Sequence, residues 1–164
     1  MYKFPIKFYL NLIFLICLVS LISAFFIEYI LGHQPCNLCL IERIPYVLGL
    51  ILIILNYILV KNERFIILLL ILIFTFSAIL SFYHLGIEQG FFEESMVCGL
   101  KDALNVITKE EILEQLQVKT VSCKDVTFRI FGFSLTTINI IISLFLTIIL
   151  TSIFLNYEKF KNQS

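Results

Sequence analysis

The chain has 164 residues, of which 60% are hydrophobic and 15% are charged, and its formal net charge is zero. This length suggests one domain. The absence of a basic patch outside the ends of the apolar runs argues against nucleic acid as a partner. A soluble globular fold is also disfavoured, because four long uncharged runs would leave so small a domain almost no polar surface.

Four uncharged runs extend over residues 8–27, 44–60, 65–87 and 130–157. Each is close to or above the roughly 20 residues that an α-helix needs to cross the hydrocarbon core. We therefore predict an all-α membrane protein, a single domain over residues 1–164. It is a four-transmembrane-helix bundle with spans at approximately 8–30, 44–60, 65–87 and 132–156, joined on one side by a short loop near 31–43 and a long loop near 88–131. The first run follows Lys3 and Lys7 as a signal peptide would, but its length and poor cleavage site favour a retained helix.

Basic residues beside the spans predict the orientation, because cytoplasmic segments carry the excess of lysine and arginine. Three short segments on one side contain Lys3, Lys7, Lys61, Arg64, Lys159 and Lys161. On the other side the short loop contains Arg43, and the long loop contains Lys101, Lys109, Lys119, Lys124 and Arg129. We expect both termini in the cytoplasm and both loops outside, in the periplasm or its equivalent.

The cysteines are distributed unevenly between spans and loops. Cys36 and Cys39 form a C-x-x-C in the short outward loop, and Cys98 and Cys123 lie in the long one. An oxidising exterior favours disulfides at such positions. Cys17 lies in the middle of the first apolar run, where cysteine commonly serves as packing, so we assign it no functional role.

Three interpretations of the loop cysteines compete. A redox relay fits the C-x-x-C, because such motifs often carry exchange chemistry with a lowered thiol pKa. Two structural disulfides are the second. A bridge between Cys98 and Cys123 would constrain the unfolded loop by about 3.5 kcal/mol, but a bridge within the C-x-x-C constrains little. A four-cysteine zinc site is the third. It would need thiolates in an oxidising compartment and lacks a second C-x-x-C, so we expect no metal.

The short loop leads into the second span. Pro35 suits a position just before a helix start, so we expect the helix to begin within this motif. Cys39 would then lie near a helix N-terminus, where unpaired N–H groups and the macrodipole favour its thiolate. Arg43, four residues later on the same face, would favour the same thiolate or anchor the span among headgroups. Pro45 would kink the helix near Ile41, which leaves the first residue of the span open.

The long loop contains a capping-box pattern from Thr108 to Glu111. We predict that a short amphipathic helix follows, with Ile112, Leu113 and Leu116 on one side. Such a helix would either lie on the membrane surface or pack within the loop.

The end of the third span places His84 and Glu88 four residues apart, on one helical face. A histidine at this boundary can contact a polar headgroup or shuttle a proton. The plainer alternative is an interfacial anchor.

The pattern Pro-Cys-x-x-Cys-x-x-Glu-Arg at residues 35–43, with this order of spans and the later cysteines, resembles the disulfide bond formation protein B (DsbB) family. The resemblance covers nearly the whole chain. It includes the supporting segments His84-x-Gly86-x-Glu88 and Phe-Gly-Phe-Ser-Leu at residues 131–135, which leads to Asn139. It implies a four-helix protein of the bacterial inner membrane that binds a quinone, ubiquinone or menaquinone, near the outer surface. One departure is the absence of tryptophan, so phenylalanine and tyrosine must supply the interfacial aromatic belt.

The resemblance also implies how the cysteines work. Cys36 and Cys39 resemble the quinone-coupled pair. Cys98 and Cys123 resemble the loop pair that reoxidises a periplasmic thioredoxin-like oxidase of the DsbA type. In this scheme Cys98 forms the bond to the partner and Cys123 exchanges with Cys36.

Three residues are implied to contact the quinone. Cys39 is the thiolate beside it, Arg43 is the neighbouring cation, and His84 matches a position nearby. The expected activity is thiol:quinone oxidoreduction, with electrons passing from the soluble partner to the membrane quinone pool.

Two alternatives remain at this stage. A quinone and thiol oxidoreductase of the vitamin K epoxide reductase type is also small and helical, but its loop cysteines precede the C-x-x-C, which is the reverse of the order here. A non-catalytic membrane subunit would use two disulfides only to staple its outer loops.

Overall fold

The computed structural model describes residues 6–58, 63–93, 98, 122–124, 128–130 and 132–158, leaving out the side chain of Ile130. The helix predicted after Thr108 lies outside these residues. The described elements are α1 (Ile6–Tyr29), α2 (Asn37–Ile41), α3 (Ile44–Ile58), α4 (Glu63–Glu88), β1 (Arg129–Ile130), β2 (Phe133–Ser134) and α7 (Leu135–Leu155). Four stretches are long and apolar enough to cross a membrane, Asn37–Ile58 counting as one. The predicted four-helix membrane fold is confirmed.

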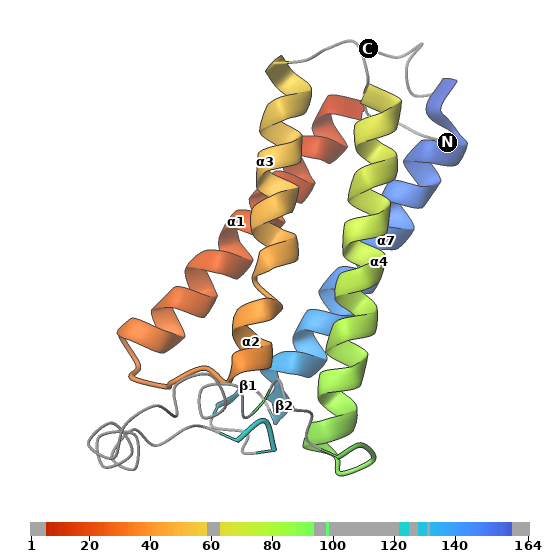
Figure 1. The fold of residues 1–164 in the computed structure, drawn as a ribbon. Helices are drawn as coiled ribbons and strands as arrows, with labels where there is room; N and C mark the ends of the chain where they lie inside the picture. The colour runs from red at the N-terminus through yellow and green to blue at the C-terminus, as the bar shows by residue number, and fades with distance from the viewer. Residues whose placement is uncertain are drawn as a thin grey trace, which may run out of the picture.

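The four spans run alternately up and down (Figure 1). The start of α1, the end of α3, the start of α4 and the end of α7 lie at one end of the bundle. The short outward loop, the two strands and the end of α4 lie at the other. The most extensive packing is between α4 and α7, followed by α1 with α3 and α3 with α4.

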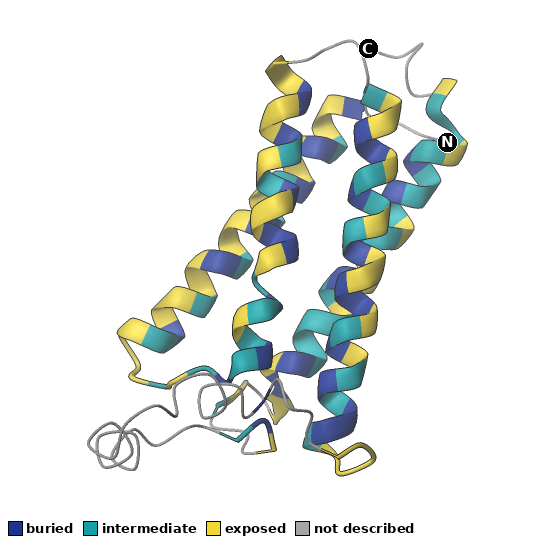
Figure 2. Ribbon diagram, viewed as in Figure 1, coloured by how far each residue is buried: buried dark blue, intermediate teal, exposed yellow. Residues whose placement is uncertain are grey.

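Each of the four long helices contributes fully buried side chains to one central cluster, among them Leu10, Ile53, Phe74 and Leu146. Many large apolar side chains point outward instead, and exposed and buried residues alternate along every helix in Figure 2. Lipid tails are as apolar as leucine, so these outer faces suit a bilayer, and the helices associate through close packing. Cys17 is completely buried in the central cluster, in agreement with the packing role expected for it.

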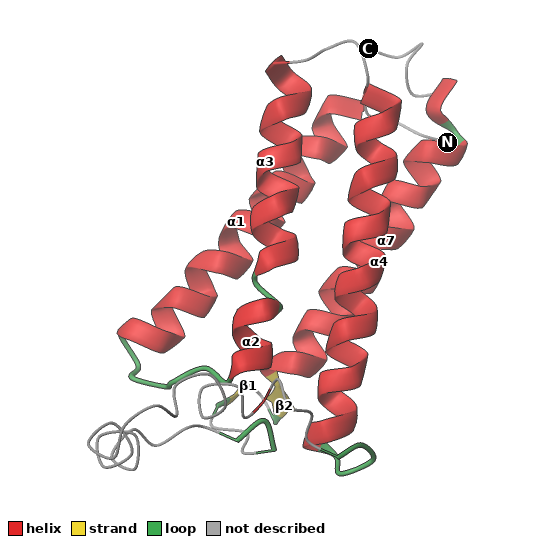
Figure 3. Cartoon of the chain, in the orientation of Figure 1, coloured by secondary structure: helices red, strands yellow, loops and turns green. Residues whose placement is uncertain are grey.

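The second span begins at Asn37, which confirms the helix start expected within the C-x-x-C motif and lies before residue 44, where the apolar run begins. Cys36 is the N-cap, and its sulfur accepts a hydrogen bond of 3.3 Å from the backbone N–H of Cys39. The helix is interrupted at Glu42 and Arg43, visible in Figure 3 as a loop between α2 and α3. Pro45 explains the interruption, since it has no N–H to donate to the carbonyl of Ile41. The kink predicted near Ile41 is therefore present.

A short antiparallel hairpin precedes the fourth span and was not predicted. Arg129 pairs with Ser134, and Ile130 with Phe133. Gly132 has a φ of +87°, which glycine adopts without steric cost. Ser134 then caps α7 by accepting a hydrogen bond of 3.2 Å from the backbone N–H of Thr137. The predicted start near residue 132 therefore moves to Leu135.

The close approach of α3 to α4 at Gly49 can be tested by substitution. A Cβ atom at this position would lie 3.1 Å from Cζ of Phe74 and 3.6 Å from Sγ of Cys17. We predict that Gly49→Val lowers the free energy of unfolding by about 1–3 kcal/mol through overpacking. Thermal denaturation of the detergent-solubilised protein measures the effect. Ile51→Val, on the exposed side of the same helix, is the control and should change little. Equal melting of the two variants would contradict this packing.

Candidate redox site

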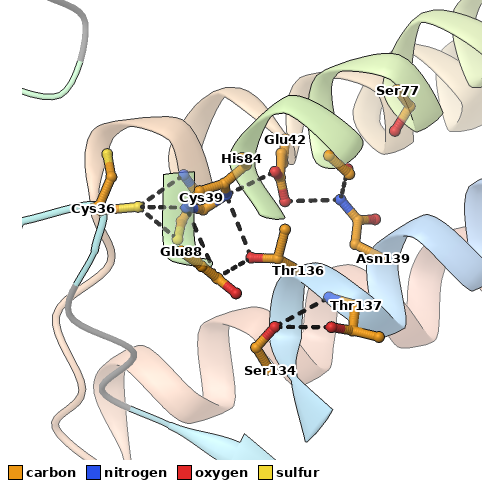
Figure 4. Close-up of polar contacts among 12 residues, drawn as sticks. Cys36, Cys39, Glu42, Ser77, His84, Glu88, Ser134, Thr136, Thr137 and Asn139 are labelled. Carbon is orange, nitrogen blue, oxygen red and sulfur yellow. Dashed lines mark hydrogen bonds and ion pairs between the residues drawn. The ribbon is translucent and has the colours of Figure 1, made fainter. Parts of the chain in front are cut away.

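Cys36 and Cys39 lie together at the N-terminus of α2, and their sulfurs are 2.8 Å apart. Both are free cysteines in this structure. Cys36 is buried, whereas Cys39 is partly accessible. Besides the backbone N–H of Cys39, the sulfur of Cys36 faces Nε2 of His84 at 3.6 Å, as Figure 4 shows.

These contacts stabilise a thiolate on Cys36. The Cys39 thiol, donating a hydrogen bond, is the largest influence that lowers the pKa of Cys36, to about 4. Burial raises this pKa, but His84 and the Cys39 backbone N–H also favour the charged form. The family resemblance assigns the reacting thiolate to Cys39 instead. The assignment of that thiolate therefore stays a prediction.

His84 comes from α4 and is 1% exposed. Its Nδ1 lies 2.8 Å from Oε1 of Glu42, in the interruption between α2 and α3. A carboxylate can only accept, so Nδ1 carries the proton and donates to Glu42. Nε2 is consequently the nitrogen directed at Cys36, where it can accept from the thiol or donate to the thiolate.

Glu88, one turn after His84, completes this side of the site. The Thr136 hydroxyl donates to Oε1 of Glu88 and accepts from Nδ1 of His84 at 3.3 Å. Oε1 of Glu88 is also 3.9 Å from Nε2 of His84. Oε2 of Glu88 is buried and has no hydrogen-bond partner among the described residues.

A polar network continues from Glu42 into the bundle. Asn139 donates to Oε2 of Glu42 at 2.8 Å and to the hydroxyl of Ser81 at 2.7 Å. The Tyr46 hydroxyl donates to Oδ1 of Asn139 and lies 3.4 Å from the Ser143 hydroxyl. The network joins α3, α4 and α7 around the Glu42 carboxylate, which supplies the hydrogen bonds that a buried charge requires.

Arg43 makes its side-chain contacts with α1. Its Nη1 donates to Oε2 of Glu28 at 2.5 Å, and the guanidinium lies 5.1 Å from the ring centroid of Phe25. It still lines the same cavity as Cys39 and His84. Its direct contacts among the described residues are therefore with α1, not with the predicted Cys39 thiolate.

Cys98 and Cys123 form a disulfide, with Cα atoms 6.0 Å apart. Both are buried in a second apolar cluster that also contains Cys36, Leu38 and Ile87. Nδ2 of Asn37 donates to the Cys98 carbonyl at 3.5 Å. Cysteines from two loops that are distant in the sequence thus meet at one end of the bundle.

A cavity of about 320 Å³ opens beside both pairs. It is bounded by α1, the start of the second span, the end of α4 and the start of α7. Apolar side chains such as Val19 and Ile142 form part of its walls, while Cys39, Arg43 and His84 supply polar groups.

A family model described as "Disulfide bond formation protein DsbB" matches residues 6–153, nearly the whole chain. The chain belongs to the DsbB family. It is also 32% identical over 148 residues to the "Uncharacterized protein RP370" of Rickettsia prowazekii (strain Madrid E), covering 86% of this chain and 84% of that protein. No solved structure gives a significant match. Membership of this family of membrane disulfide bond formation proteins implies disulfide oxidoreductase activity.

The structure gathers most of the DsbB-type residues that the sequence singled out. The sulfur of Cys36 lies 2.8 Å from that of Cys39 and 3.6 Å from Nε2 of His84. Cys98 and Cys123 pack in one cluster with Cys36, and Arg43 lines the same cavity. Sequence reasoning placed Glu88 beside His84 on one helical face, and Oε1 of Glu88 does lie 3.9 Å from Nε2 of His84. It assigned no contacts to the remaining polar residues of the site, which are Glu28, Glu42, Tyr46, Ser81, Thr136 and Asn139.

A signal for some of them was present. Thr136, Asn139 and Ser143 are spaced at helical intervals in the apolar fourth run, which places them on one face. Polar side chains inside a membrane span usually face the bundle interior and often mark a functional path.

Asn139 provides a test of the network in this DsbB-family protein. Asn139→Ala removes a donor to the buried Glu42 carboxylate, so we predict a loss of about 1–3 kcal/mol in the free energy of unfolding. Asn11→Ala is the matched control, because Asn11 only accepts from Tyr57 in an exposed pair. Thermal stability of the two purified variants should differ clearly. Equal melting would mean that the Glu42 network adds nothing to stability.

Proposed function

We propose that this protein reoxidises a periplasmic thioredoxin-like oxidase of the DsbA type and passes the electrons through its two cysteine pairs to membrane quinone. The observation that carries the proposal is the packing of the Cys98–Cys123 disulfide against Cys36 beside a cavity. Family membership supports the disulfide chemistry. Two structural staples explain the site less well, because a bridge within the C-x-x-C would close too short a ring to constrain the rest of the chain.

The first exchange involves the loop pair. A thiolate of the partner attacks Sγ of Cys98, forming a mixed disulfide and releasing Cys123 as a thiolate. The released Cys123 attacks Cys36 of an oxidised Cys36–Cys39 pair, forming a second mixed disulfide and releasing the Cys39 thiolate. The partner's second thiol then displaces Cys98, which attacks Cys123 and frees Cys36. Two electrons have moved from the partner to the short-loop pair, and the loop disulfide is restored.

Quinone, when bound, accepts two electrons and two protons and becomes quinol. The cavity fits such a molecule, because ligand sites are mostly apolar with a few polar groups that fix orientation. Its volume of about 320 Å³ lies at the lower end of the usual range of such sites. Arg43 and His84 would hold the ring oxygens, and His84 can carry a proton to or from the Cys36 sulfur. Ubiquinone and menaquinone both satisfy this description.

The orientation supports the same proposal. The helix ends that the basic segments adjoin in the sequence, namely the starts of α1 and α4 and the ends of α3 and α7, lie away from the cysteines, so the cysteine end faces the periplasm and both termini face the cytoplasm. Disulfides persist there, and a soluble periplasmic partner can reach Cys98.

The division of labour between the cysteines predicts which one captures the partner. With Cys123→Ala the resolving thiol is absent, so the mixed disulfide between Cys98 and the partner should accumulate. Non-reducing electrophoresis of cells expressing the variant and a DsbA-type protein measures it. Cys98→Ala is the matched control and should give no adduct. Equal trapping through Cys36 would contradict the order of exchange.

Arg43 is predicted to act on quinone binding and not on partner exchange. Arg43→Gln removes a positive charge from the cavity, so the KM for quinone should rise about 10–100-fold, the loss expected for a charge-assisted hydrogen bond. Exchange between the loop disulfide and a reduced partner should continue at its normal rate. Quinone reduction by the purified protein in detergent gives the first value, and stopped-flow exchange the second.

Two control variants separate the possible causes. Arg64→Gln should leave both values unchanged, because Arg64 lies over the ring of Phe154 at the opposite end of the bundle. Glu28→Gln keeps the charge of Arg43 and removes only its carboxylate partner. If Glu28→Gln raised KM as much as Arg43→Gln, the ion pair would matter through positioning alone. An unchanged KM in Arg43→Gln would leave Arg43 as an anchor to α1.

A further inference from the structure

We infer that the reduced Cys36–Cys39 pair, together with His84 and Glu88, forms a binding site for one thiophilic divalent cation of the zinc or cadmium type. The sulfurs of Cys36 and Cys39 and a ring nitrogen of His84 all lie within 4.8 Å of one another. This set differs from a four-cysteine site, since Cys98 and Cys123 are bonded to each other. The cation-binding site uses only free thiols of the short loop, so it does not depend on the proposed function.

The distances among the two sulfurs and the histidine nitrogen suit tetrahedral coordination after a small movement of Cys39. Bonds of about 2.3 Å to sulfur and about 2.0–2.1 Å to nitrogen place those two ligand atoms about 3.6 Å apart. Sγ of Cys36 and Nε2 of His84 are 3.6 Å apart. The two sulfurs must separate by about 1 Å from their 2.8 Å contact to reach tetrahedral spacing. Cys39 is partly accessible, and rotation of its side chain can supply this movement.

Glu88 provides an independent indication of a ligand. Its side chain is 7% exposed, and Oε2 is buried with no hydrogen-bond partner among the described residues. An unsatisfied buried carboxylate oxygen is costly. Glu88 lines the same cavity as Cys36, Cys39 and His84, and its Oε1 is 3.9 Å from the nitrogen facing the sulfurs. The carboxylate lines the cavity beside these three groups but lies outside their 4.8 Å cluster, so it becomes the fourth ligand after its side chain rotates toward the sulfurs.

Glu42 orients the histidine for this role. Metal-binding histidines usually donate their other ring N–H to a carboxylate, which fixes the tautomer and raises ligand basicity. Nδ1 of His84 donates to Glu42, and Asn139 holds the second oxygen of Glu42. When the ring is neutral, Nε2 has its lone pair toward the sulfurs. Sulfur, nitrogen and carboxylate oxygen are the ligands that zinc accepts in proteins.

Binding and oxidation exclude each other at this pair. The cation takes both sulfurs as thiolates, and any proton on either thiol is released to solvent. A Cys36–Cys39 disulfide has no thiolate to offer. If the protein works as proposed above, the cation will hold the pair reduced and block transfer of its electrons to quinone.

Cadmium titration of the full-length protein in detergent tests the inference, because cadmium–thiolate bonds absorb in the ultraviolet. The background variant carries Cys98→Ser and Cys123→Ser, so that reduction exposes no loop thiols. After reduction and removal of the reductant, one cadmium ion should bind. The same protein with its Cys36–Cys39 pair oxidised should bind none, and Cys36→Ser should lose the signal. Cys17→Ala is the cysteine control and should bind normally.

Three substitutions examine the other ligands. Glu42→Gln should weaken binding about 10–100-fold, the usual effect of losing a partner of a metal-bound histidine. Glu88→Gln should weaken it by about tenfold or more, and His84→Gln at least as much. Glu93→Gln, an exposed carboxylate in the turn after α4, is the matched control and should have no effect. If a substituted protein does not fold, cadmium NMR of the background protein gives an alternative measurement. It reports whether the cadmium ion has one nitrogen and one oxygen ligand in addition to two sulfur ligands.

Each outcome decides the inference. Equal binding by the oxidised protein, or affinities unchanged in both His84→Gln and Glu88→Gln, would overturn it, as would a spectrum of sulfur ligands alone. A separate assay of quinone reduction by the unsubstituted protein tests the proposed function. Cadmium binding without quinone reduction would preserve the site and remove that function. Quinone reduction without cadmium binding would do the reverse.

Discussion

The hydrogen bond between Nδ1 of His84 and Oε1 of Glu42 is the contact on which the rest of the site depends. It joins α4 to the interruption in the second span, and so it places the C-x-x-C against the histidine. A carboxylate inside a membrane protein is costly unless donors surround it. Here His84 and Asn139 donate to its two oxygens from two different helices. The carboxylate therefore requires α3, α4 and α7 to meet in one arrangement.

The break in the second span makes this arrangement possible. In a continuous helix through Pro45, the angle between the Glu42 and Arg43 side chains would be fixed by the helical repeat. Interrupting it after Ile41 lets Glu42 turn inward to His84, while Arg43 reaches outward to Glu28 of α1. Two adjacent residues of opposite charge thus bind opposite sides of the bundle. The C-x-x-C lies on the short α2 segment that these two contacts hold in place.

The sequence was sufficient for the spans, because runs of uncharged residues report hydrocarbon thickness directly. It also selected the cysteine pairs, Arg43 and His84 as candidates, through loop position and through resemblance to a family, and the family match confirmed that resemblance. The apolar runs placed the starts of the second and fourth spans too late and too early, at residues 44 and 132, whereas Pro35 correctly indicated a helix start within the C-x-x-C motif. Hydropathy does not register an N-cap such as Cys36, or a short hairpin such as the one that ends at Ser134. The contacts of Thr136 with His84 and of Asn139 with Glu42 were missed for another reason. Helical spacing shows that two side chains lie on the same face of their helix, but it does not show which other helix packs against that face.

The hydrogen-bonded polar side chains of the site extend only part of the way through the bundle from the cysteine end. Ser77, which contacts Ser143 at 3.0 Å, lies furthest from the cysteine end among the linked hydroxyls. Beyond it the described core consists of apolar side chains such as Leu70, Ile67, Ile53 and Leu150, with Asn56 as the one buried polar side chain. Such a layer offers no continuous chain of hydrogen bonds for proton hopping. The protons that the quinone takes up would therefore come from the side on which the thiols react, and turnover would proceed without moving charge across the bilayer. The helical half nearer the termini would act as an electrical insulator.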